Sequence, residues 1–408
     1  MEEKDIKIES EYKDQFDLEL PPNPNYLLEV RHLKKYFPLN ANLLGKPQAY
    51  LRAVDDISFG LEKGKTIGIV GESGCGKTTL GRTILRLYDI TGGKVFFEGQ
   101  DLAEVSPKEL RKKRVDLQLI FQDPYSSLPP RMTVGEIISE AVKVHKIVPK
   151  AQISEHVRDI MKKCGLQPQY YDRYPHEFSG GQRQRICIAR ALAVNPKLVI
   201  CDEPVSALDV SIQAQIINLL KDLQKDMGLT YMFISHDLSV VKYITDKIAV
   251  MYLGNMMEIG NTKEIFKEPL HPYTKALFSA VPVPDPDQKM HRIILEGDIP
   301  SPANPPSGCK FHTRCSKCMA ICKKESPKFI HYKDDHFVAC HLYDDYMLEK
   351  NKELEKELKA LEEDKLLHPE KYIEVKEEPK TSKDKVINVT KTCVDKVKGV
   401  FTKDGKKE

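Results

Sequence analysis

Residues 66–79 read TIGIVGESGCGKTT. The stretch joins a short apolar run of strand length, a glycine-rich loop and the first residues of a segment with helical spacing. Its second part, from residue 71 to residue 78, matches the pattern G-x-x-x-x-G-K-[ST]. Glycines let such a loop curl so that its N–H groups point at phosphate oxygens, and the following helix presents its positive end to them. The stretch therefore predicts a nucleotide-binding α/β domain.

The residue types in this loop suit a triphosphate with its metal ion. We expect Lys77 to reach the β- and γ-phosphates of ATP and the Thr78 hydroxyl to ligate Mg²⁺. The other residues of the loop expected to bind the nucleotide are Gly71, Ser73, Gly74, Gly76 and Thr79.

Polar residues also end three further apolar runs. LVICDE at 198–203 places Asp202 and Glu203 at the carboxyl end of a predicted buried strand, where open α/β sheets bind ligands. Asp202 suits Mg²⁺ and Glu203 suits polarising the attacking water. Gln122 follows LIF and His236 ends YMFISH. We interpret both as catalytic, with Gln122 also near the Mg²⁺, because of their order relative to the phosphate loop.

The order of predicted elements indicates one α/β domain around a central parallel sheet. β-rich runs alternate with helical stretches across residues 26–265, and an all-helical insertion occupies about 126–178. Residues 1–25 are polar and proline-rich at their end, which predicts a mobile leader. A C-terminal extension at 266–343 precedes a charged tail at 344–408, expected to form a short helix and then to be disordered.

Composition argues against several classes of protein. The net charge of +3, from 63 basic and 60 acidic residues, gives no general attraction to nucleic acid. The first residues lack the pattern of a signal peptide, and no apolar run approaches the ~18 residues of a membrane span. We therefore expect a cytosolic protein that reaches a membrane through a partner.

Taken together, the motifs across residues 26–261 resemble those of the ATP-binding subunits of ABC transporters, a P-loop NTPase family. Besides the loop, Gln122, the acidic pair and His236, the chain contains the signature in FSGGQRQR at 178–185 and SALD at 206–209. The resemblance implies that Tyr36 stacks on adenine. It also implies a head-to-tail dimer in which the signature of one chain completes the ATP site of another, through Ser179, Gly180, Gly181, Gln182 and Asp209.

The extension narrows the resemblance to oligopeptide and dipeptide importers. EPLHPYTKALFSAVPVPDP at 268–286 is similar to their C-terminal extension, and FPLNANLLGKPQAYLRAVDD at 37–56 is similar to the F-type member of their paired ATPases. This implies a D-type partner ATPase, two integral membrane permease subunits, an extracellular peptide-binding protein and a peripheral position on the cytoplasmic face of the membrane. Import of nickel or another small solute is an alternative, as is a soluble ABC ATPase acting on nucleic acid or ribosomes.

Five of the ten cysteines lie between residues 309 and 340. In a reducing cytosol such a cluster indicates metal or redox chemistry rather than disulfides. Zinc sites favour two C-x₂₋₄-C pairs and only one is present, whereas a [4Fe–4S] cluster tolerates irregular spacing. The resemblance to peptide importers implies a [4Fe–4S] cluster, with Cys318 as a spare or substitute ligand, on Cys309, Cys315, Cys322 and Cys340. Zinc, supported by four nearby histidines, and unligated thiols remain alternatives.

Overall fold

The computed structural model describes residues 16–41, 47–281 and 292–367. Described residues through Lys352 belong to one compact unit, and those from Glu353 onward belong to a second. The helix expected in the charged tail is α12 (Asp345–Leu367), whose last residues lie in the second unit. Residues 368–408 and most of the predicted leader lie outside the described residues.

The main sheet has eight strands in the order β11-β12-β10-β9-β3-β8-β7-β6. Its parallel part confirms the predicted α/β fold: β3 pairs with β8 and β9, β8 pairs with β7, and β7 pairs with β6. Every residue of β3, β7 and β8 is buried, which explains why their sequences are almost continuously apolar. These strands are β3 (Thr66–Val70), β6 (Leu117–Ile120), β7 (Leu198–Asp202), β8 (Thr230–Ile234) and β9 (Lys247–Tyr252).

A second, antiparallel sheet of four strands packs over the first through helix α1 (Lys77–Ile84). Its order is β2-β1-β4-β5, and the strands are β1 (Tyr26–Ala41), β2 (Pro47–Glu62), β4 (Gly92–Phe97) and β5 (Gln100–Asp101). One core cluster joins both sheets to the helix, and Leu28, Ile57, Leu80, Ile200 and Ile234 are fully buried in it. The phosphate loop therefore starts from the middle of the core.

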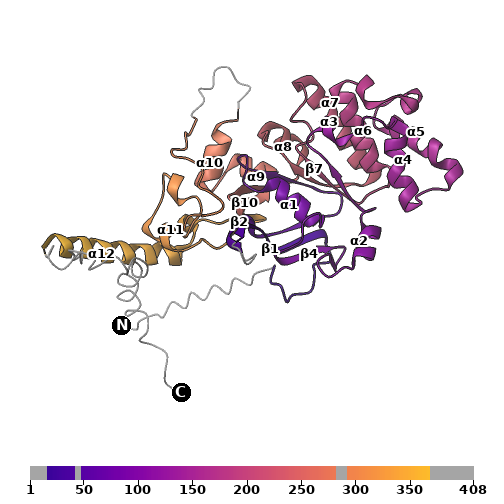
Figure 1. Ribbon diagram of the computed structural model, residues 1–408. Helices are drawn as coiled ribbons and strands as arrows, with labels where there is room; N and C mark the ends of the chain where they lie inside the picture. Colours follow the sequence, from indigo (N-terminus) through magenta and orange to yellow (C-terminus); the bar gives the residue numbers. More distant parts are fainter. Residues whose placement is uncertain (1–15, 42–46, 282–291, 368–408) are drawn as a thin grey trace, which may run out of the picture. The chain divides into compact units, whose positions relative to one another are not determined.

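The chain between β6 and β7 is helical, as the sequence predicted for much of this stretch. Helices α4, α5 and α6 pack against one another beside the sheet region (Figure 1). Thr133 and Ser179 close capping boxes at the starts of α4 and α6. The helices of the core are α2 (Pro107–Lys113), α3 (Pro124–Ser127), α4 (Val134–His145), α5 (Ile153–Lys163), α6 (Gly180–Leu192), α7 (Val210–Met227) and α8 (Leu238–Ile244). No helix among the described residues combines the length and apolarity needed to cross a bilayer.

The C-terminal extension shares the main sheet with the core. Strand β12 pairs with β10 and with β11, so the extension adds two antiparallel strands to the sheet edge. A separate small cysteine-rich domain is therefore not confirmed. The elements concerned are β10 (Asn255–Asn261), α9 (Thr262–Lys267), α10 (Pro272–Ser279), α11 (Ala320–Lys324), β11 (Ile330–Lys333) and β12 (His336–Val338).

The described end of the predicted leader is bound to the core by a buried arginine. The Arg31 guanidinium donates hydrogen bonds to the carbonyl oxygens of Asp17, Leu20 and Pro21 at 2.6–2.8 Å. Glu29 balances its charge with an ion pair of 2.7 Å. Residues 17–21 are thus hydrogen-bonded to the core, and the mobility of residues 1–25 stays a prediction.

A buried carboxylate fastens the extension to the sheet. Glu258 in β10 has no exposed surface and contacts His336 of β12 through a 2.7 Å bond between its Oε1 and the imidazole Nε2. The same carboxylate accepts the backbone N–H groups of Leu270 and His271 at 2.8 and 2.9 Å. One side chain therefore satisfies three donors that water does not reach.

We predict that Glu258→Ala lowers the free energy of unfolding by about 3–5 kcal/mol, because it leaves three buried donors without an acceptor. Urea unfolding of the full chain measures this. Glu268→Ala serves as the control, because Glu268 forms only an exposed ion pair with Lys333 and its loss should hardly move the midpoint. Equal midpoints for both variants would contradict the structural role of Glu258.

Candidate nucleotide-binding site

The phosphate loop between β3 and α1 adopts a backbone that only glycine accommodates. Gly71 has φ +152° and Gly76 has φ +105°. A Cβ atom on Gly71 would lie 2.2 Å from the Met251 carbonyl oxygen, and one on Gly76 would lie 2.0 Å from that of Ala53. The loop is therefore held against the end of β9 and the middle of β2, with its amides ahead of α1, and its shape fits the phosphates of ATP.

Lys77 and Thr78 occupy the positions that phosphate and metal chemistry require. The buried Lys77 ammonium donates to the carbonyl oxygens of Gly71 and Glu72 at 2.8 and 3.0 Å. The Thr78 hydroxyl donates to Asp202 Oδ1 at 2.8 Å. Thr78 and Asp202 are thereby brought together from distant parts of the sequence, as a shared Mg²⁺ site requires. Burial raises the pKa of Asp202, so protons compete more strongly with a cation for this carboxylate.

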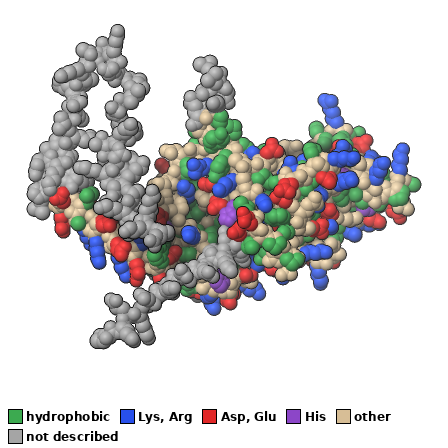
Figure 2. Space-filling model, turned by 90° about the horizontal axis from the view of Figure 1, so that it is seen from below, with side chains coloured by type: hydrophobic (Ala, Val, Ile, Leu, Met, Phe, Trp, Pro, Cys, Tyr) green, Lys and Arg blue, Asp and Glu red, His purple; other side chains and the backbone are tan. Residues whose placement is uncertain are grey.

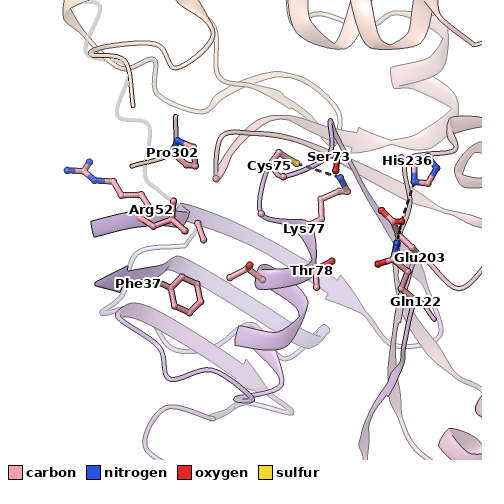
Figure 3. Close-up of a pocket in the computed structure, with 16 residues that line it drawn as sticks. Phe37, Arg52, Ser73, Cys75, Lys77, Thr78, Gln122, Glu203, His236 and Pro302 are labelled. Carbon is pink, nitrogen blue, oxygen red and sulfur yellow. Dashed lines mark hydrogen bonds and ion pairs between the residues drawn. The ribbon is translucent and has the colours of Figure 1, made fainter. Parts of the chain in front are cut away.

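The two other predicted catalytic residues, Gln122 and His236, both lie next to one carboxylate oxygen of Glu203. Gln122 donates from Nε2 to Glu203 Oε2 at 2.7 Å, and His236 Nδ1 lies 3.4 Å from the same oxygen (Figure 3). Glu203 itself sits at φ +46°, and its N–H donates to the Ile234 carbonyl oxygen of β8. Glu203 thus lies at the ends of the neighbouring strands β7 and β8, with its carboxylate in the site. Such a group can orient a water molecule and take up its proton.

These residues line one cavity of about 570 Å³ (Figure 3). Its predicted lining residues are Ser73, Gly74, Gly76, Lys77, Thr78, Thr79, Gln122, Glu203 and His236. Residues that the sequence did not assign to the site are Phe37, Leu51, Arg52, Ala53, Cys75, Gly254 and Pro302. Pro302 comes from the proline-rich loop of the extension, and no local pattern could have placed it beside a loop more than 200 residues earlier.

The structure offers Phe37, and not the predicted Tyr36, as the aromatic ring for adenine. Phe37 lines the cavity, whereas Tyr36 lies outside the lining and its hydroxyl donates to the Asp55 carboxylate. A shift in the β1–β2 register falls between Lys35 and Tyr36, and neighbouring residues of a strand point to opposite faces. A sequence prediction that is wrong by one position therefore assigns Tyr36, instead of Phe37, to the face of the strand that lines the cavity.

The signature residues lie at the start of α6, away from the cavity lining. Ser179 caps the helix by accepting the Gln182 N–H at 3.4 Å, and Gln182 Oε1 accepts the Ser179 N–H at 3.1 Å. A Cβ atom on Gly181 would lie 2.5 Å from the Ile212 side chain. Asp209 stands at the N-cap of α7. Ser179, Gly180, Gly181, Gln182 and Asp209 are all absent from the cavity lining of their own chain.

The prediction of an iron–sulfur centre is wrong. Within residues 16–41, 47–281 and 292–367, no three His, Cys, Asp or Glu side chains are arranged to hold a metal ion, which also removes the zinc alternative. Cys309, Cys315, Cys318, Cys322 and Cys340 are free thiols. Spacing shows where the cysteines lie along the chain. Only the tertiary structure decides whether their side chains meet around one point.

The buried thiols Cys309, Cys322 and Cys340 serve as packing groups. Burial raises the pKa of Cys309 and Cys340 to about 12. The segment is closed by a backbone bond of 2.8 Å from the Cys309 N–H to the Cys322 carbonyl and by the buried side chains of Phe311 and Ile321. Apolar contact and backbone bonding therefore replace the metal that the spacing suggested.

We predict that Phe37→Leu weakens ATP binding about tenfold, because stacking of an aromatic ring on a base contributes about 1–3 kcal/mol. Titration of the full chain with a fluorescent ATP analogue measures the dissociation constant.

The matched control is Tyr36→Leu, the same change on the neighbouring residue, whose ring does not line the cavity. Its ATP affinity should stay within about twofold of the unsubstituted chain. A larger loss for Tyr36→Leu than for Phe37→Leu would restore the prediction made from the sequence.

Comparisons with known proteins agree with this geometry. A family model described as ABC transporter matches residues 54–206, and one described as Oligopeptide/dipeptide transporter, C-terminal region, matches residues 257–322. Among solved structures, cbiO1 from Clostridium perfringens, part of an ABC transporter complex, is 29% identical with a TM-score of 0.52 over 60% of this chain and 92% of its own. A dimeric ATP-binding cassette, MJ0796, bound to ADP and Pi is 25% identical with a TM-score of 0.52, over 58% and 98% of the two chains.

Curated relatives are closer in sequence. The oligopeptide transport ATP-binding protein AppF of Bacillus subtilis is 54% identical over 79% of this chain and 98% of its own length. OppF of Haemophilus influenzae, with the same description, is 54% identical over 78% of this chain and 97% of its own. The chain therefore belongs to the family of ABC transporter ATP-binding proteins that includes the oligopeptide transport ATP-binding proteins.

Proposed function

We propose that this chain hydrolyses ATP to power the import of oligopeptides or dipeptides through an ABC transporter. The observation that carries the proposal is the coincidence of two features in one chain. The Glu203 carboxylate stands at the phosphate cavity with Gln122 and His236, as ATP hydrolysis requires. The C-terminal region matches that of oligopeptide and dipeptide transporters, and the curated relatives are named for peptide transport.

Phosphate binding, metal binding and activation of water fall to different residues of the site. The loop amides and Lys77 bind the β- and γ-phosphates, and Thr78 and Asp202 are the residues that would hold Mg²⁺. When bound, the ion would supply positive charge against the charge that develops on the phosphate oxygens. Glu203 orients the attacking water and accepts its proton, and Gln122 and His236 hold the carboxylate in place through Oε2.

A second ATPase completes the site in this proposal. Ser179, Gly180, Gly181, Gln182 and Asp209 of the predicted ATP-binding set do not line the cavity of their own described chain. A helix start carries a positive dipole and free N–H groups, which suit the γ-phosphate held by another chain. We assign that chain to the D-type subunit, and ATP then closes the pair while hydrolysis opens it.

The remaining partners follow from the same assignment. The helical segment of α3 to α6, with Gln122 at its start, transmits closure to two integral membrane permease subunits on the cytoplasmic face. An extracellular peptide-binding protein delivers the substrate to those permeases and contacts this chain only through them. The extension at 266–343 acts as one unit with the ATPase core.

Reconstitution tests transport directly. The chain is assembled with its partner ATPase and the two permeases in vesicles, and ATP-dependent accumulation of labelled oligopeptides is measured in the presence of the external binding protein. Accumulation of peptides supports the proposal. Accumulation of nickel without peptides, or ATPase activity that responds only to ribosomes or DNA, contradicts it.

We predict that Glu203→Gln lowers kcat for ATP hydrolysis about 10²–10⁴-fold, because the amide cannot accept the proton of water. ATP affinity should be retained, since the phosphates are bound by the loop and Lys77. A phosphate-release assay and nucleotide titration measure the two quantities.

Glu104→Gln is the matched control, because this exposed carboxylate does not line the cavity. Its turnover should equal that of the unsubstituted chain. Undiminished hydrolysis by the Glu203 variant would exclude Glu203 as the base.

A further inference from the structure

Glu72 is the one acidic residue in the phosphate loop, and all its polar groups are engaged. Its N–H donates to the Tyr273 hydroxyl at 2.9 Å, and its carbonyl oxygen accepts the Lys77 ammonium at 3.0 Å. Its carboxylate binds Arg314. Two of these three partners come from the C-terminal extension and the third is the phosphate-binding lysine. Glu72, whose carbonyl oxygen accepts the Lys77 ammonium, is therefore held by residues from outside the ATPase core.

The bond to Arg314 is bidentate and largely shielded from water. Arg314 Nη1 donates to Glu72 Oε2 at 2.7 Å and Nη2 donates to Oε1 at 3.2 Å. The Arg314 side chain is 8% exposed and that of Glu72 is 25% exposed. Hydrogen bonding to the carboxylate raises the pKa of the guanidinium, which stays charged. Two parallel bonds fix the direction of the Glu72 side chain as well as its charge.

An aromatic cluster supports these two extension residues. Tyr252, Tyr273 and Phe311 are 0–1% exposed, and their ring centroids lie 4.9–5.3 Å apart. Tyr252 ends β9 next to Met251, whose carbonyl oxygen touches the Gly71 position. The cluster joins the core strand beside the loop to Tyr273 of α10 and to Phe311, three residues before Arg314. The support beneath the loop is thus rigid and apolar.

A second contact of the extension reaches the other side of the cavity. The Arg52 N–H of β2 donates to the Pro302 carbonyl oxygen at 3.2 Å, and both residues line the cavity. The extension therefore touches the nucleotide site at the cavity wall and beneath the phosphate loop.

We propose that Arg314 is a positioning residue for the phosphate loop: it neutralises Glu72 and fixes this residue so that the loop and Lys77 receive the triphosphate. A carboxylate within a phosphate loop repels the ligand unless a cation compensates it. Arg314 supplies that cation and turns the carboxylate toward the extension. The C-terminal extension is then part of the ATP-binding machinery. This role rests on the ATPase activity proposed above.

The test uses the full chain with Arg314→Met, which keeps the length of the side chain and removes its charge. We expect the dissociation constant for ATP, and KM in the assembled transporter, to rise about tenfold because an uncompensated carboxylate is left beside the phosphates. The value of kcat at saturating ATP should change less than about twofold, because the lost contact affects ground state and transition state alike. Arg314→Lys restores the positive charge without the two parallel hydrogen bonds. Its ATP dissociation constant should lie between that of the unsubstituted chain and that of Arg314→Met.

The double variant Glu72→Gln with Arg314→Met separates positioning from general loosening of the fold. If Arg314 acts through the Glu72 charge, removing that charge brings the ATP dissociation constant back to within about threefold of the original. Lys333→Met is the matched control, because it breaks an ion pair of the extension away from the loop and should leave KM unchanged. An unchanged ATP affinity in Arg314→Met, or no recovery in the double variant, overturns the proposal.

A measurement on the unsubstituted chain keeps the test valid if Arg314→Met fails to fold. Coupling between two sites is reciprocal, so bound ATP should slow hydrogen exchange in residues 309–322 as well as in the phosphate loop. Exchange that slows in the loop alone overturns the proposal while leaving the ATPase intact. Absence of ATP binding by the unsubstituted chain would instead reject the proposed function.

Discussion

The phosphate loop of this protein lies in backbone contact with two other strands. The loop leaves β3 in the middle of the parallel sheet, and at Gly71 and Gly76 it passes the carbonyl oxygens of Met251 in β9 and Ala53 in β2. No Cβ fits between these backbones. Because β2 belongs to the second sheet, the same contacts that shape the loop also fix the two sheets relative to α1, and the cavity forms where all three meet.

The chemistry of the site depends on that arrangement of strands. Parallel strands end at the same edge of a sheet, so β7 brings Asp202 to Thr78, while Glu203 lies beside His236 after β8. Gln122 reaches the same carboxylate from the end of β6. Residues far apart in the sequence thus converge at one edge of the sheet, where hydrogen bonds join them.

The C-terminal extension shows how spacing can mislead. Its cysteines suggested a metal-held module, yet β12 joins the core sheet and Glu258 binds the extension through three buried hydrogen bonds. Cys309, Cys322 and Cys340 are buried thiols of this extension. The Phe311 ring lies beside Tyr273, whose hydroxyl accepts the N–H of Glu72 in the phosphate loop. Among the described residues, sheet pairing and buried polar contacts thus attach the extension to the ATPase core.

The sequence by itself determined the nucleotide loop, the parallel core and the polar residues at the strand ends beside it, because each follows from local rules. Gly71 and Gly76 are needed by backbone geometry, and Asp202 and Glu203 end an apolar strand. The tertiary structure decided which side chains face the cavity and which distant residues pair, because local rules do not specify either. A register shift in β1 turned Phe37 instead of Tyr36 into the cavity. The pairing of Arg314 with Glu72 joins residues more than 200 positions apart, whose approach is set by packing.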